Sequence, residues 1–120
     1  MARAFFTGLP AALRAIRRAR RAADDARRPA LEEWAKDTRD TAKGFAGVLT
    51  GQLRRDISYR MLNDANANVG VYGPSRRYAG YQEKGTSKMR AQPFMRPAFA
   101  RHRNDLSRRY RREFRLRARF

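Results

Sequence analysis

The chain has 120 residues, of which 29 are lysine or arginine and 11 are aspartate or glutamate, so its formal net charge is +18. This length predicts one domain and leaves no room for a second. The absence of cysteine excludes disulfides, zinc–thiolate sites and thiol nucleophiles. No apolar run approaches the roughly 20 residues of a membrane-spanning helix. So large a positive charge predicts an acidic or polyanionic partner that neutralises it.

The first predicted element is a long basic helix. Thr7 is the candidate N-cap and Pro10 lies in the first turn. Apolar residues then recur at three- and four-residue steps, the spacing of one helical face. That face comprises Leu9, Leu13, Ile16, Ala19 and Ala23. The opposite face comprises Arg14, Arg17, Arg18, Arg21 and Arg28.

Pro29 either kinks this helix or opens a second one, because proline is tolerated at a first helical position but not inside. Trp34 is the natural core anchor of the stripe that follows. Glu32 and Glu33 would lie in the first turn after Pro29, where the helix dipole favours acids. We therefore expect them to stabilise the start of a helix and not to form a catalytic pair. The whole stripe comprises Leu31, Trp34, Ala35, Thr38, Ala42 and Phe45.

An antiparallel hairpin is predicted next. From Leu53 the period changes to two, which places alternate residues up to Met61 on one side of a strand. The segment 63–68 is rich in Asn, Asp and Ala and suits a hairpin connection or a longer mobile loop. Residues 69–72 form the returning strand, and Gly73-Pro74-Ser75 closes it with strong turn chemistry.

A Gly/Pro loop that ends at Pro93–Pro97 leads into a basic C-terminal helix with Pro97 at its start. Phe99, Arg103, Leu106, Tyr110 and Phe114 have helical spacing, and arginines cover the remaining faces. The order of elements predicts an α+β fold in a single domain, 1–120. Within it we distinguish a basic helical arm, 1–28, a core, 30–105, and an Arg-rich helix end, 106–120.

Nothing in the sequence indicates catalysis, a cofactor or a metal. The segment Gly80–Thr86 has threonine, not the lysine of a phosphate loop, after its second glycine. The single histidine, His102, belongs to no triad motif, and we expect it to pack between helices or lie at the surface. The acids form no metal-like spacing, and pairing within helices explains most of them. We therefore expect no enzymatic activity.

The arginine faces point to a binding function. Such runs attach to phosphates or carboxylates without reading base sequence, and the sequence does not separate these two ligands. The candidate residues that face a partner or DNA are Arg14, Arg17, Arg18, Arg21, Arg108, Arg109, Arg111, Arg112 and Arg115. Tyr110 and Phe114 have the spacing of core residues more than of base-stacking ones.

Two blocks are more specific. The first is Thr50-Gly51-Gln52-Leu53-Arg54-Arg55-Asp56-Ile57, and the second runs from Tyr78 through Glu83-Lys84-Gly85-Thr86-Ser87-Lys88-Met89 to Pro93-Phe94-Met95-Arg96-Pro97-Ala98. Together they resemble the neck or tail-component family of long-tailed bacteriophages over about residues 30–105. The second block carries the resemblance, because a long ordered string matches and not only a few glycines.

The resemblance implies a structural virion protein at the head–tail junction, assembled in the bacterial host cytoplasm and without cofactor or membrane. It implies a ring of six- or twelve-fold symmetry, with connector, head-closure, tail-terminator or tail-tube proteins as neighbours. The basic ends would then face packaged DNA in the channel or dock on acidic proteins. We favour docking for the C-terminal helix and leave the N-terminal one open.

The second block is the candidate assembly loop. Gly85 permits an unusual backbone angle, prolines stiffen the segment, and Phe94 and Met95 offer apolar plugs for a neighbour. The alternative is that the loop only leads into the last helix. Its candidate residues are Glu83, Gly85, Thr86, Met89, Pro93, Phe94, Met95 and Pro97. The competing function for the chain is that of a small basic nucleic-acid-binding protein, architectural or ribosome-associated.

Overall fold

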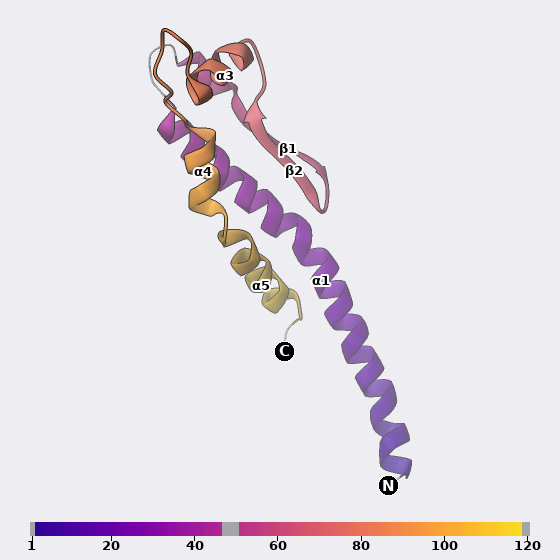
Figure 1. Cartoon of the computed structure of the whole chain (residues 1–120). Coiled ribbons are helices and arrows are strands. Elements are labelled where there is room, and N and C mark those ends of the chain that lie inside the picture. Colours follow the sequence, from indigo (N-terminus) through magenta and orange to yellow (C-terminus); the bar gives the residue numbers. More distant parts are fainter. Residues whose placement is uncertain (1, 47–50, 119–120) are drawn as a thin grey trace.

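The chain folds into a narrow rod of 78 × 21 × 19 Å (Figure 1). The structure is a computed structural model that describes residues 2–46 and 51–118, with side chains from residue 8 onward. Thr50 and Arg119 lie outside the described residues. The elements are α1 (Ala2–Phe45), α2 (Gln52–Asp56), β1 (Ile57–Asn63), β2 (Asn66–Val71), α3 (Arg76–Lys84), α4 (Met95–His102) and α5 (Asp105–Ala118). The predicted α+β class is confirmed.

Helix α1 forms the long axis of the molecule. It begins at Ala2, so Thr7 lies within it and is not its N-cap. It also runs through Pro29, which neither ends it nor opens a second helix. Pro29 cannot donate a hydrogen bond to the Asp25 carbonyl, and Asp25 is exposed, so water can bond that group. Glu32 and Glu33 therefore lie in the middle of a helix, not in a first turn.

The hairpin is confirmed but is shorter than predicted. Leu53 and Asp56 belong to the short helix α2, and the first strand begins only at Ile57. The strands pair antiparallel from Ile57↔Val71 to Met61↔Ala67. A tight turn joins them, in which the Asn63 Oδ1 accepts a hydrogen bond from the Ala65 N–H at 2.8 Å. The segment 63–68 is thus a hairpin end and not a long loop.

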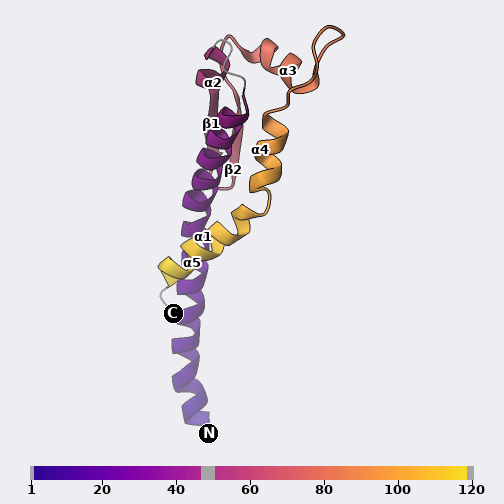
Figure 2. The same cartoon turned by 90° about the vertical axis from the view of Figure 1, so that its left-hand side faces the viewer.

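The C-terminal part contains two helices that the sequence did not predict as separate elements. Helix α3 occupies the start of the expected loop. The expected single C-terminal helix is divided, because α4 ends at His102 and α5 begins at Asp105. Asp105 stands in the first turn of α5, where its charge complements the helix dipole. Figures 1 and 2 show α4 and α5 running back along α1 toward the N-terminus.

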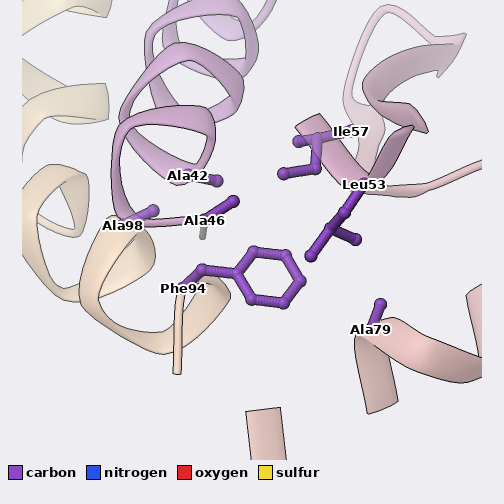
Figure 3. Packing of buried hydrophobic residues seen from close by; sticks show 7 residues of the cluster. All are labelled: Ala42, Ala46, Leu53, Ile57, Ala79, Phe94 and Ala98. Atoms are coloured by element: carbon purple, nitrogen blue, oxygen red, sulfur yellow. The ribbon is translucent and has the colours of Figure 1, made fainter. Parts of the chain in front are cut away.

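The main core is a small cluster at the C-terminal end of α1. It joins α1, α2, β1, α3 and α4 (Figure 3). Phe94 is its one aromatic ring, and alanines on α1 and α4 let the helices approach closely. Farther along α1, Ala22, Ala26 and Ala30 are also buried, as is Ala118 of α5. The cluster comprises Ala42, Ala46, Leu53, Ile57, Ala79, Phe94 and Ala98.

Candidate assembly surface

Residues 85–94 form a loop that projects beyond the end of the rod (Figure 2). The carboxylate of Glu83 fixes its far end. It accepts hydrogen bonds from the backbone N–H groups of Phe94 (2.8 Å), Met95 (3.1 Å) and Arg96 (2.9 Å). These groups open α4, so Glu83 caps that helix although it lies on α3. The loop is therefore held between two helices.

Gly85 starts the loop with φ +77°, a conformation that side chains rarely adopt. A Cβ atom there would lie 2.8 Å from the backbone nitrogen of Ala91 and 3.0 Å from the Met89 carbonyl oxygen. The tip is closed by a turn in which the Thr86 N–H donates to the Met89 carbonyl at 2.8 Å. Glycine is thus required because the loop folds back against its own first residue.

The candidate loop residues divide between surface and core. Pro93 and Thr86 are exposed, whereas Met89 and Pro97 are half-buried. Phe94 is only 1% exposed and points into the core (Figure 3). Met95 packs against the same cluster. The interpretation of Phe94 as an outward plug was therefore wrong, because the Glu83 cap turns the chain inward at that point.

We expect acid to loosen this loop. Burial of the Glu83 carboxyl raises its pKa, but the three backbone N–H groups lower the pKa by more, so it lies below its ordinary value of 4.5. The unfolded state then binds more protons than the folded state, and stability falls as the pH drops below about 4.5. Glu83→Gln should lower the unfolding free energy at neutral pH by about 1–2 kcal/mol.

Thermal melting of wild type and Glu83→Gln at pH 7 and at pH 3.5 tests this expectation. The difference between the two proteins should shrink at the lower pH, because Glu83 of the unfolded chain is then largely protonated and part of the stabilisation by the ionised cap is lost. An equal difference at both pH values would contradict an ionised cap.

The C-terminal arginines are partly neutralised within the chain. Arg109 lies against α1 with its side chain 13% exposed, and it forms ion pairs with Glu33, at 2.6 Å, and with Asp37. Arg112 donates to the Glu33 carboxylate at 2.6 and 2.7 Å. The Arg112 hydrogen bond is the largest cause that holds the pKa of Glu33 below its ordinary value. Arg109 and Arg112 thus fasten α5 to α1.

The other C-terminal candidates are more exposed. Arg108 pairs with Asp105 at 2.6 Å, and Arg111 donates to the Ser107 carbonyl. Arg115 is exposed and has no ion pair among the described residues. The expectation that the C-terminal charge has to be neutralised from outside is therefore incorrect for Arg109 and Arg112.

Arg109→Ala should weaken the attachment of α5. It removes a nearly buried cation, leaves Asp37 without its ion pair and leaves Glu33 with Arg112 alone. We expect a loss of about 1–3 kcal/mol, below the value for fully buried pairs because both carboxylates are partly exposed. Urea unfolding followed by circular dichroism measures it. Arg112→Ala is the matched control and should cost much less, because that side chain is 57% exposed. Equal losses for both variants would refute the special role of Arg109.

His102 joins three helices. Its Nε2 lies 2.6 Å from the Thr41 hydroxyl, and its Nδ1 lies 3.0 Å from an oxygen of Asp105. Its carbonyl accepts a hydrogen bond from the Trp34 indole at 2.8 Å. Because Thr41 lies inside α1 and Asp105 opens α5, these contacts hold α4 and α5 against α1. His102 is a packing residue.

The N-terminal arginines have no such partners. Arg14, Arg17, Arg18 and Arg21 are exposed, and none forms an ion pair within the described part of the chain. Three apolar side chains of the same segment are exposed as well. They are Leu9 (42%), Leu13 (45%) and Ile16 (64%). The predicted apolar face of this segment exists, but no other part of the described chain covers it.

Sequence reasoning missed the residues that lock the helices together. Trp34 was recognised as an anchor, but its bond to His102 was not predicted. Glu33 was predicted to stabilise the start of a helix, whereas it binds two arginines of α5. The only available signal was that acids cluster between residues 24 and 40, opposite an Arg-rich helix that had to fold back somewhere.

Among the described residues, no group of His, Asp and Glu is arranged to hold a metal ion. The described helices include none that is long and apolar enough to cross a membrane. Neither curated proteins nor solved structures yielded a match to the chain.

A family model described as "Bacteriophage HK97-gp10, putative tail-component" matches residues 11–85. The match covers more than half of the chain, from the first exposed turns of α1 to Gly85 at the base of the loop. It includes the whole first block, residues 50–57, and residues 78–85 of the second block, whereas residues 86–98 lie outside the match. The resemblance to bacteriophage tail components is confirmed: the chain belongs to the HK97-gp10-like family of phage tail components.

Proposed function

We propose that this structural phage protein acts in the neck, where copies of it form a closed ring that joins the DNA-filled head to the tail. One observation carries the proposal: the main core lies at one end of a 78 Å rod, and the opposite end is a helix that nothing in the described chain covers. A protein that functioned alone would gain nothing from such an extension. An assembly component uses it to reach a neighbour.

A ring requires two different surfaces on each copy, because its contacts are head-to-tail. The projecting loop 85–94 is one candidate. The hairpin offers another, since β1 and β2 form a two-stranded sheet in the described chain and each leaves an edge without a strand partner. The loop and the strand edges support a ring of head-to-tail contacts. The sedimentation experiment below gives the number of copies.

We also propose that the protein has no catalytic function. The Thr41–His102–Asp105 chain of hydrogen bonds has the order of a nucleophile, a base and an acid, but it lies at a helix-packing contact. The exposed arginines of α1 would equally suit a nucleic-acid-binding protein. That alternative function does not require the projecting loop or the exposed apolar stripe.

Complementation tests the proposal. Lysates of a phage in which this gene is interrupted should contain DNA-filled heads and separate tails, and the purified wild-type chain should join them. Electron microscopy counts the joined particles, and sedimentation of the chain on isolated necks gives its copy number. Normal particles in the lysate without the protein would refute a role in the neck.

A further inference from the structure

We propose that residues 8–21 of α1 are a docking arm that binds an acidic protein groove with an apolar floor on a neighbouring virion component. The inference rests on the function proposed above and names the chemistry of one partner. It also reassigns the docking role, because the sequence had favoured the C-terminal helix. We call residues 8–21 the arm.

The arm carries an uncovered apolar stripe. Leu9, Leu13 and Ile16 follow one another at four- and three-residue steps, so they lie on one face of the helix. All three are between 42% and 64% exposed. Toward the middle of α1 the chain covers its own alanines, since Ala22 and Ala26 are at most 4% exposed. The stripe thus lies on the part of α1 that precedes its contacts with the other described elements.

The arm also carries the largest group of unneutralised charges on α1. Arg14, Arg17, Arg18 and Arg21 form a second stripe, again at three- and four-residue steps. The first acid after them is Asp24, which pairs with Arg27 at 3.8 Å. On α5, by contrast, several arginines have carboxylate partners within the chain. The arm therefore presents, within eight residues of one helix, four exposed arginines without an acid partner in the described chain.

The apolar stripe and the charged stripe together indicate what kind of partner the arm binds. DNA would neutralise the arginines but leave the apolar stripe in water. A second copy of the arm would place like charges against one another. A lipid surface needs a broader apolar face, and Arg20 follows Ile16 by one four-residue step, which places a charge on the stripe. A groove with apolar floor and carboxylates along its rim satisfies both stripes, as in helix-in-groove recognition.

The test uses the full chain in the particle-joining assay described above. The first variant, L9Q/L13Q/I16Q, removes the apolar stripe without changing the charge, and glutamine is a good helix former. The second, R14Q/R17Q/R18Q/R21Q, removes the charge stripe. The matched control, R76Q/R77Q/R101Q/R103Q, removes four exposed arginines that lie outside the arm and outside α5. Circular dichroism confirms that each variant is folded.

We expect both arm variants to join particles at least about tenfold less well than wild type, since loss of one buried apolar side chain already has that effect. The control should work normally. Binding to a 30-base-pair DNA duplex should be unaffected by L9Q/L13Q/I16Q. Normal joining of particles by either arm variant would overturn the proposal that the arm docks on a partner, while leaving the proposed neck function intact. Failure of the wild-type chain itself would overturn both.

A lysine version identifies the partner chemistry. R17K/R21K keeps the charge, and carbodiimide couples a lysine amine to a carboxylate in direct contact. Joined particles should yield a cross-link between the arm and an aspartate or glutamate of another virion protein, mapped by mass spectrometry. Joined particles in which the arm cross-links to no acid of another protein would overturn the proposal. So would arm-dependent binding to vesicles of one-third phosphatidylglycerol with no arm-dependent joining, which would indicate a lipid ligand.

Discussion

Phe94→Ala should lower the free energy of unfolding by about 3–5 kcal/mol, the usual range for removing a buried aromatic side chain. Phe94 is the one aromatic ring in a core built largely of alanines, and it touches elements from both ends of the chain (Figure 3). Because a domain of this size has about 5–15 kcal/mol in total, a substantial fraction of its stability would be lost.

Thermal denaturation of the purified protein measures this loss. Tyr81→Ala is the matched control, because Tyr81 is an aromatic residue near the same loop but is 49% exposed. It should change stability by no more than about 0.5 kcal/mol. A Phe94→Ala protein that melts like wild type but fails to join particles would show that Phe94 contacts a neighbouring protein and does not stabilise the core.

Trp34→Ala should have the second-largest effect, a loss of about 3 kcal/mol, at the low end of the range for buried aromatic side chains because Trp34 is only partly buried. The indole packs edge-on against Phe99, with ring centroids 5.4 Å apart, and its N–H donates to the His102 carbonyl at 2.8 Å. It therefore binds the end of α4 to the middle of α1. Without it, α4 and α5 should separate from α1 more readily, which urea unfolding followed by circular dichroism would detect.

Trp34→Phe separates the two contributions. Phenylalanine keeps an aromatic contact with Phe99 but leaves the His102 carbonyl without its donor, at a cost of about 1–2 kcal/mol. If Trp34→Phe and Trp34→Ala are equally unstable, the hydrogen bond is the main contribution of Trp34 and the ring packing is secondary.

The sequence predicted the elements whose apolar residues repeat over many turns. The stripes from Leu9 to Phe45 identified α1, and the turn residues after Tyr72 identified the end of the hairpin. Leu53 was assigned to the strand that contains Ile57, whereas it belongs to α2, which ends at Asp56. Their four-residue separation suits a helical turn as well as a strand. A short segment with two apolar residues carries too little information to choose.

The remaining errors have a common physical origin in tertiary contacts. Helix α3 buries a glutamine, Gln82, together with Ala79, so its inner face has no apolar signature. The break between α4 and α5 falls between Phe99 and Leu106, whose seven-residue separation suits either one helix or two. The ion pairs were also not predictable, because 29 basic residues can pair with 11 acids. Nothing in the sequence indicates that Glu33 pairs with Arg109.

The way α5 returns along α1 determines when the protein can fold during its synthesis. Arg109 contacts Glu33 across 76 residues, and the Tyr110 hydroxyl bonds to the Ala23 carbonyl across 87 residues. The alanine face of α1 therefore leaves the ribosome long before the helix that covers it exists. This part of the chain can therefore complete its fold only after α5 has been synthesised, and a nascent chain stalled before α5 exposes the alanine face of α1 and is aggregation-prone.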